Sequence, residues 1–129
     1  MNKKWNLLFC DPFLKPCPVA EFIDGCRPEH QVKMLHFLEL LEEMGPTLPR
    51  PYADLLEDGI HELRVRLSGD HMRLLYFFCF ENYIIVYRAL RKTAGKVPEE
   101  YIRETRKYRE IFLSRISRHD LERYDHVEL

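Results

Sequence analysis

Three strand-like runs follow one another in the middle of the sequence, with only short turns between them. The first, "IHELRVRL" (60–67), alternates apolar and polar residues, whereas "HMRLLYFFCF" (71–80) is nearly all apolar and "YIIVYRAL" (83–90) resembles it. Alternation indicates a strand with one buried face, and a continuous apolar run indicates a strand covered on both faces. The intervening "SGD" and "EN" are typical of hairpin turns. The chain is therefore predicted to contain an antiparallel meander on which the remaining elements pack.

The segment before the meander is predicted to hold one strand and two helices. Residues 5–9 can form the strand, and the Pro-rich "DPFLKPCP" that follows is predicted to be a loop. The stretch "PVAEFIDG" (18–25) predicts a short helix, with proline at its first position and glycine at its end. A long helix is opened by Pro28 and ended by Gly45-Pro46. The stretch "TLPRPYADLLEDG" then predicts an irregular connection to the meander.

Two predicted helices carry an apolar stripe that is expected to face the core. In the long helix, residues recur at helical spacing at Val32, Leu35, Leu38, Leu41 and Met44. A last helix begins at Pro98, and its stripe is Tyr101, Thr105, Tyr108, Phe112 and Ile116. The resulting order, β-α-α-β-β-β-α, predicts an α+β domain with an antiparallel sheet of about four strands.

The length of 129 residues suits one domain with a core and is too short for two. We expect residues 1–118 to form that domain and residues 119–129 to be an acidic C-terminal tail. No apolar run approaches the ~20 residues that a membrane helix needs. The N-terminal residues do not resemble a signal peptide, so a cytoplasmic protein without a membrane partner is expected.

The cysteine and histidine patterns do not predict a metal site or a disulfide. The four cysteines, Cys10, Cys17, Cys26 and Cys79, show no CxxC spacing, and the six histidines form no HxxxH pair. We therefore expect reduced thiols, no metal and no cofactor.

The net charge of −1 conceals an uneven distribution of charge along the chain. Residues 1–60 carry 6 basic and 10 acidic side chains, a net of −4, whereas residues 61–118 carry 13 basic and 7 acidic, a net of +6. Residues 119–129 carry 1 basic and 4 acidic side chains, a net of −3. A basic section bracketed by acidic segments is the pattern of a polyanion site.

Strand register predicts where the cationic side chains of the meander point. We expect two-residue turns in both hairpins, at Gly69-Asp70 and Glu81-Asn82. The cross-strand pairs then include Arg66 with Arg73, Arg64 with Leu75, Phe77 with Val86, and Leu75 with Arg88. Cross-strand partners share a face, and so do residues two apart. The cationic side chains on one face are therefore Arg64, Arg66, His71, Arg73 and Arg88. The opposite face, which helices can cover, holds Val65, Leu67, Met72, Leu74, Tyr76, Ile85, Tyr87 and Ala89.

The segment "RALRKTAGKVP" (88–98) adds Arg91, Lys92 and Lys96 beside this face and contains no acidic residue. Like charges that face each other across strands are destabilising unless something neutralises them. Guanidinium groups bind phosphate bidentately, so their convergence predicts a phosphate-binding site with the segment as its rim. The cations of the last helix are expected to form only a solvated outer face.

The order and spacing of several motifs resemble the RelE/ParE toxin superfamily, and more narrowly its phage-derived HigB-like branch. The motifs are "LELLEEMG", "L-x-x-G-I-H-E-L-R" (56–64), "M-R-L-L-Y-F" (72–77), "R-K-T-x-x-K-x-P" (91–98) and the helix "E-E-Y-I-R-E-T". The resemblance covers about residues 5–112. It implies a RelE-like fold, a sheet with two helices on one face and a basic groove on the other.

The resemblance also implies the toxin of a type II toxin–antitoxin pair, usually one that cleaves mRNA in the ribosomal A site. Its partners would be the ribosome, mRNA and a small helix-turn-helix antitoxin. By motif match, the functional positions of the family fall on Arg64, Arg73, Arg91, Lys92 and Lys96. Arg88 stands where the family often has histidine, and Arg91 where it often has lysine.

The implied reaction is metal-independent endoribonuclease chemistry. A 2′-hydroxyl attacks the adjacent phosphate and leaves a 2′,3′-cyclic phosphate and a 5′-hydroxyl, and fixed cations stabilise the charged intermediate. The residues predicted to be catalytic are Arg64, Arg73, Arg88, Lys92 and His71. Those predicted to bind RNA are Arg66, Arg91, Lys96 and Tyr101. Arginine stays protonated, so Lys92, His71 or Tyr101 must transfer protons, unless the ribosome and substrate do so.

Two other functions remain open from the sequence. One is a ParE-like gyrase inhibitor, which binds a protein target and cleaves no RNA. The other is a toxin-derived module that binds RNA or a protein without catalysis. The arginine at position 88 and the acidic segments favour this last alternative.

Overall fold

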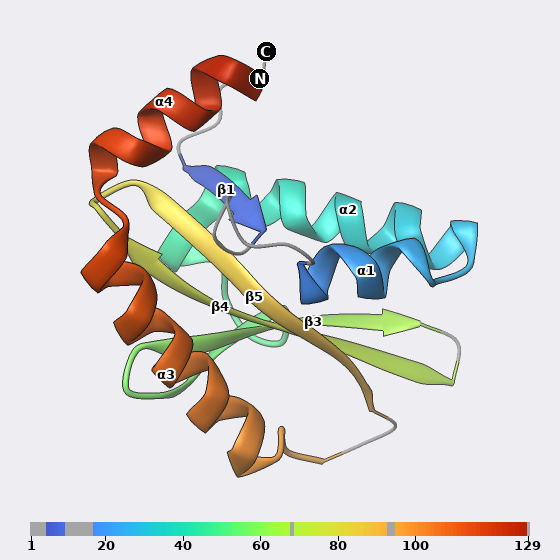
Figure 1. Cartoon of the computed structure of the whole chain (residues 1–129). Coiled ribbons are helices and arrows are strands. Elements are labelled where there is room, and N and C mark those ends of the chain that lie inside the picture. Colours follow the sequence, from blue (N-terminus) through green and yellow to red (C-terminus); the bar gives the residue numbers. More distant parts are fainter. Residues whose placement is uncertain (1–4, 10–16, 68, 93–94, 129) are drawn as a thin grey trace.

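The computed structural model describes residues 5–9, 17–67, 69–92 and 95–128, with only the backbone for Lys92 and residues 124–128. The strands are β1 (Asn6–Phe9), β2 (Ala53–Glu57), β3 (Ile60–Leu67), β4 (Asp70–Cys79) and β5 (Tyr83–Lys92). The helices are α1 (Pro18–Asp24), α2 (Pro28–Met44), α3 (Glu99–Arg115) and α4 (Arg118–Glu128), with a 3₁₀ turn η1 (Gly45–Thr47) after α2. Figure 1 shows a single twisted sheet against which α1, α2 and α3 lie.

The strands form one sheet of order β1-β5-β4-β3-β2, with β1 parallel to β5 and the other neighbours antiparallel. The predicted α+β class is confirmed, but the sheet is mixed and has five strands, whereas about four antiparallel strands were predicted. The additional strand is β2, which lies in the stretch expected to be irregular. This strand has only five residues, too few to show a clear alternation of apolar and polar side chains. Pro49, Pro51 and Gly59 flank it, and these residue types usually indicate turns and loops.

The register of the first hairpin differs from the predicted one without changing the faces. Leu67 pairs with Asp70, and Arg64 lies opposite Arg73, whereas the predicted pairing placed Arg66 there. The difference is a slip of two positions, and side chains alternate between faces with a period of two. The slip therefore leaves every side chain of the hairpin on its predicted face.

The second hairpin turns through three residues, where two were predicted, with positive φ at Phe80 and Glu81. Phe77 consequently pairs with Ile85, and Ile85 lies on the face opposite to the predicted one. A bulge in β5, between the partners of Leu75 and Tyr76, absorbs the extra residue. Beyond it, the predicted pairing of Leu75 with Arg88 holds.

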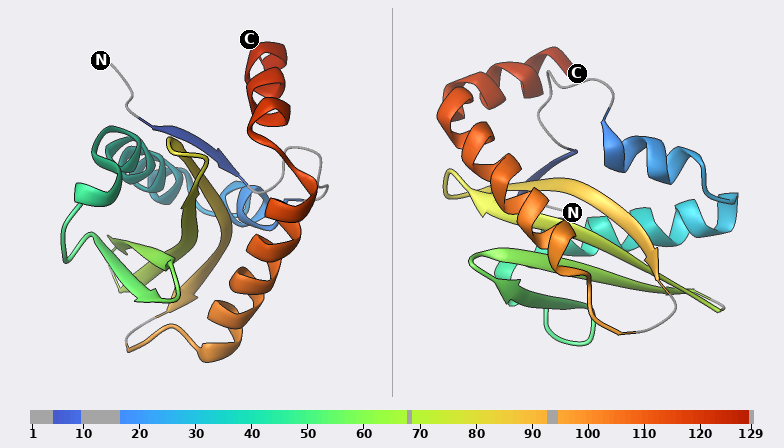
Figure 2. Two further views of the ribbon diagram at one scale, coloured as in Figure 1. Left: turned by 90° about the vertical axis from the view of Figure 1, so that its left-hand side faces the viewer. Right: turned by 60° about the horizontal axis from the view of Figure 1, so that its bottom comes forward.

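Helices cover both faces of the sheet, and each face has its own core. The core beneath α1 and α2 contains Leu63, Val65, Met72, Leu74 and Tyr76 from the sheet. The core beneath α3 contains Ile60, Leu75, Phe77 and Ile85 from the sheet. Figure 2 shows α3 on one side of the sheet, with α1 and α2 on the other. The predicted basic face is therefore partly covered by α3.

The buried stripe of α2 is rotated from the predicted one. Met34, Leu38 and Leu41 are buried, whereas Val32 is 68% exposed and Leu35 47% exposed. At 3.6 residues per turn, Val32 lies about 200° around the helix from Met34, so the two cannot share a buried face. The prediction that Val32 and Leu35 are core residues is wrong.

The end of the chain packs on the α3 side of the sheet. Thr105, Phe112 and Ile116 are buried as predicted. Residues assigned to an acidic tail form α4, whose Leu121 is buried with the core beneath α3. Asp120 accepts hydrogen bonds from the backbone N–H and hydroxyl of Ser117, at 2.8 and 3.0 Å. These hydrogen bonds lower the pKa of Asp120 and fix the first turn of α4. In the described part of the chain, no helix is long and apolar enough to cross a membrane.

Candidate nucleic-acid interface

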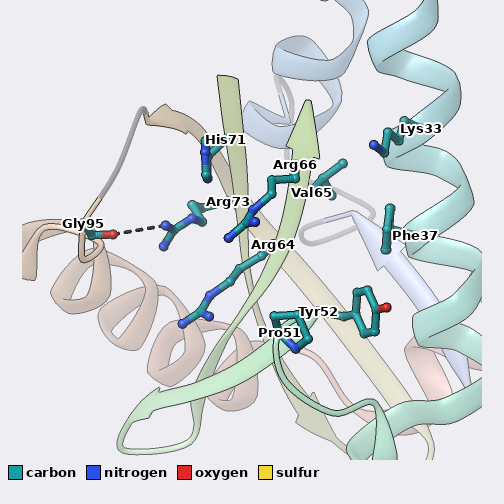
Figure 3. A pocket seen from close by; sticks show the side chains of 10 residues that line it. All are labelled: Lys33, Phe37, Pro51, Tyr52, Arg64, Val65, Arg66, His71, Arg73 and Gly95. Atoms are coloured by element: carbon teal, nitrogen blue, oxygen red, sulfur yellow. Dashed lines mark hydrogen bonds between the residues drawn. The ribbon is translucent and has the colours of Figure 1, made fainter. Parts of the chain in front are cut away.

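Strands β3 and β4 place a group of cationic side chains at one edge of the sheet. Arg64 lies opposite Arg73, and Arg66 opposite His71. Strand β2 pairs with β3 only as far as Leu63, so the outer edge of β3 lacks a strand partner beyond that point. The cationic side chains therefore line an opening between this edge and α2 (Figure 3).

This opening is a pocket of about 500 Å³. Its described lining residues are Lys33, Phe37, Pro51, Tyr52, Arg64, Val65, Arg66, His71, Arg73 and Gly95. They include four basic side chains, one imidazole and two aromatic rings, and none of them carries a carboxylate. No hydrogen bond or ion pair joins Arg66 or Lys33 to another described residue. The pocket thus presents unneutralised positive charge next to apolar surface. We call it the cationic pocket.

The buried carboxylate of Glu62 holds two of these arginines from behind. Glu62 is 1% exposed and Arg73 is 7% exposed. Arg73 donates to Glu62 Oε1 at 2.8 Å and to the Gly95 carbonyl at 3.1 Å. Arg64 donates through Nε to Glu62 Oε2 at 2.7 Å, and through its terminal nitrogen to Asp54 at 3.0 Å. Both guanidinium groups are therefore held in fixed orientations.

This ion-pair cluster corrects one argument from the sequence. The arginines that converge on this face were expected to repel one another until a phosphate neutralised them, but Glu62 already bridges Arg64 and Arg73. The sequence contained the signal, because Glu62 is two residues before Arg64 and so shares its face. Arg64 and Arg73 do not need an external anion to fold. Charge available to a ligand comes chiefly from Arg66, Lys33 and the remaining donors of Arg64.

Arg88 and Tyr101 are on the predicted face but outside the cationic pocket. Arg88 donates to Glu104 of α3 at 2.8 Å, and its guanidinium lies 4.8 Å from the centre of the Tyr101 ring. Ile102, the next residue of α3, instead lines a neighbouring pocket together with Glu62 and Arg73. Helix α3 therefore separates Arg88 and Tyr101 from the other predicted site residues.

The cations at the end of β5 and just after it are divided in the same way. Arg91 pairs with Met72 and so lies on the α1 face, 5.8 Å from the centre of the Phe22 ring and 3.6 Å from Asp70. It is not part of the cationic pocket. The backbone of Lys92 lies opposite His71. Lys96 lines a second pocket of about 340 Å³, which shares Arg64, Arg73 and Gly95 with the cationic pocket.

The titratable groups with shifted pKa values lie outside the cationic pocket. Burial lowers the pKa of His61, partly offset by Asp54, and this ring stacks on Tyr76 at 5.3 Å on the α2 face. Burial, helped by Glu62 and Asp54, raises the pKa of Tyr76. Burial also raises the pKa of Cys79 to about 12, so its thiol stays protonated at neutral pH. These groups serve packing.

The described residues contain no group of three His, Cys, Asp or Glu side chains that could hold a metal ion. The described cysteines, Cys17, Cys26 and Cys79, are not in disulfides. Cys10 lies outside the described residues.

Residues 21–110 match the family described as phage-derived protein Gp49-like (DUF891). The chain belongs to this family. The match extends from α1 to α3 and includes every described residue that lines the cationic pocket. The Gp49-like family is associated with the RelE toxin–antitoxin superfamily, in agreement with the resemblance of the motifs. A comparison with curated proteins finds no similar sequence.

Proposed function

We propose that this Gp49-like protein is the toxin of a type II toxin–antitoxin pair, of the HigB-like branch, and that it cleaves mRNA on the ribosome. The observation that supports this most strongly is the cationic pocket, which combines fixed guanidinium groups with aromatic rings and lacks a described carboxylate in its lining. Cationic side chains bind the phosphates of RNA, and aromatic rings stack on its single-stranded bases. Its partners would be mRNA, the ribosome and a helix-turn-helix antitoxin.

In this proposal the cations of the pocket divide the work. Arg66 and Lys33 attract the RNA backbone, because no described residue neutralises them. Arg64 and Arg73, oriented by Glu62, stabilise the negative charge that develops on the phosphate oxygens. Preorganised donors cost no reorganisation when the charge appears, so the buried carboxylate supports the reaction although it does not touch RNA.

Proton transfer is assigned to His71. An imidazole titrates near neutral pH, whereas arginine cannot act as a base. His71 lies opposite Arg66 and lines the cationic pocket. It would take the proton of the 2′-hydroxyl as that oxygen bonds to phosphorus. The P–O5′ bond breaks in the same step, and the leaving 5′-oxygen takes a proton from solvent water. Lys92 is the second candidate, because its backbone lies opposite His71.

A non-catalytic RNA-binding module is the second candidate function. Two observations favour it: Arg64 and Arg73 are already paired with Glu62 and Asp54, and Arg88 stands at a position where the family often has histidine. A gyrase inhibitor has less support, because a protein target does not require a pocket of cations and aromatic rings.

Induced expression followed by mapping of mRNA 5′ ends tests the proposal. Wild-type protein should produce codon-phased cuts, and His71→Gln should reduce them about 10²- to 10⁴-fold, the usual contribution of general acid–base catalysis. His119→Gln, an exposed histidine of α4, is the matched control and should cut like wild type. Gyrase-linked DNA breaks without mRNA cuts, or harmless expression of soluble protein, would contradict the nuclease.

A further inference from the structure

The wall of the cationic pocket opposite the arginines is aromatic. Phe37 projects from α2 and Tyr52 from the loop before β2, with ring centroids 5.9 Å apart and an angle of 32° between the rings. Figure 3 shows both rings on the α2 side, facing Arg64 and Arg66 across the pocket. Tyr52 is 43% exposed, although it sits beside a well-packed core. A large, exposed ring in a cationic pocket offers a ligand a flat apolar face.

The backbone holds Tyr52 in place before any ligand arrives. Its N–H donates to the Pro49 carbonyl at 3.0 Å, and its own carbonyl accepts from the Arg64 N–H at 2.8 Å. Tyr52 is therefore tied directly to a strand residue whose side chain lines the same pocket. The partner ring of Phe37 is half-buried against the core beneath α2. The aromatic wall is thus preorganised, which reduces the entropy lost on binding.

Phosphate binding alone does not require this wall. A polyphosphate or another simple anion would be satisfied by Arg64, Arg66 and Lys33, and would gain nothing from two ring faces. A nucleobase of a single-stranded RNA stacks on aromatic side chains, whatever its sequence. The volume of about 500 Å³ lies within the ~300–1,000 Å³ typical of small-molecule sites. The pocket therefore matches a nucleotide as a unit, with the base against the rings and the phosphate against the arginines.

We propose that Phe37 and Tyr52 form a nucleobase-stacking subsite, which holds one base of a single-stranded RNA next to the phosphate bound by Arg66. This inference rests on the proposed function, because it assumes that the cationic pocket binds RNA. The subsite would add selectivity for unpaired RNA, which the arginines cannot supply. A base can stack on these rings only if it is not stacked and paired within a helix.

The test compares two probes that carry the same number of phosphates. One is a short 2′-O-methyl RNA, which lacks the attacking 2′-hydroxyl and cannot be cleaved. The other is the same 2′-O-methyl backbone without bases. Tyr52→Ala in the full chain should weaken binding of the first probe roughly 5- to 150-fold, the loss typical of one stacked base, and leave the second unchanged. Tyr52→Phe should restore binding, because it keeps the ring.

A matched control variant is Leu55→Ala, which removes an exposed apolar side chain from β2 outside the cationic pocket. It should bind both probes like wild type. If Tyr52→Ala does not weaken binding of the base-containing probe, or weakens both probes equally, the stacking subsite is wrong while RNA binding by the pocket stands. If the wild-type protein binds neither probe, the proposed function itself fails, and the two failures are thus distinguishable.

Discussion

Arg73 and Arg88 lie on the same face of neighbouring strands and have different surroundings. Arg73 is almost fully buried and is held by Glu62 and a backbone carbonyl at the edge of the cationic pocket. Arg88 is partly exposed and is paired with Glu104 on α3, over the ring of Tyr101. Helix α3, which carries Glu104 and Tyr101, packs on this face of the sheet.

The difference teaches that a shared face is not a shared site. Strand register decides the side of the sheet to which an arginine belongs, whereas the helix that packs on that side decides what the arginine contacts. The acidic partners of the two arginines also differ, because Glu62 belongs to β3 and Glu104 to α3. Each arginine can therefore be tested through its own acidic partner.

The largest effect on stability is expected from Glu62→Gln. This change leaves the buried charge of Arg73 without its counter-charge, and breaking a buried pair on one side costs about 3–5 kcal/mol. Urea denaturation of both proteins measures the difference in the free energy of unfolding. A loss below about 1 kcal/mol would mean that the Glu62 cluster does not anchor this edge of the sheet.

The corresponding change beside Arg88, Glu104→Gln, should have a much smaller effect. Both partners are partly exposed, and pairs of this kind contribute about 0.2–1 kcal/mol. The same denaturation experiment measures it, with Glu62→Gln as the reference. If the two changes cost the same, the contrast between a buried and a solvated arginine is wrong.

The smallest expected effect on stability is a pH dependence from His61 on the opposite face. Burial lowers its pKa below 6.5, so the unfolded chain binds more protons than the folded protein as the pH falls through that value. This contribution to stability is complete above pH 6.5 and is lost on acidification. The melting temperature should therefore fall less for His61→Gln than for wild type between about pH 7.5 and about pH 5.5. An identical fall in both proteins would exclude His61 as a source of the pH dependence.

The sequence correctly predicted the face of the sheet on which five side chains lie: Arg64, Arg66, His71, Arg73 and Arg88. The prediction needed only the alternation of side chains between the two faces, and not the exact cross-strand pairs. A slip of two positions in the first hairpin leaves each side chain on the same face, and a bulge in β5 compensates for the extra residue of the second turn. Ile85, which lies between that turn and the bulge, was assigned to the wrong face for the same reason.

The site as a whole was less predictable than the faces, because it depends on packing between distant elements. The position of α3 over the sheet and the approach of Tyr52 to Arg64 leave no periodic signal in the sequence. Arg91 was grouped with the rim from its charge and the family motif, but its pairing with Met72 turns it to the α1 face. Charge composition predicted an anion site, and only the fold shows which cations lie together.

Binding of an uncleavable 2′-O-methyl RNA by Arg66→Ala and Arg88→Ala tests the central claim most directly. Both changes remove one arginine from the same face of the sheet, but only Arg66 lines the cationic pocket. Arg66→Ala should weaken binding roughly 10- to 150-fold, as expected for a hydrogen-bonded charge, and lower the salt dependence by about one phosphate contact. Arg88→Ala should bind like wild type. Equal losses in the two variants, or a loss in Arg88→Ala alone, would place the RNA elsewhere on the sheet and contradict the account.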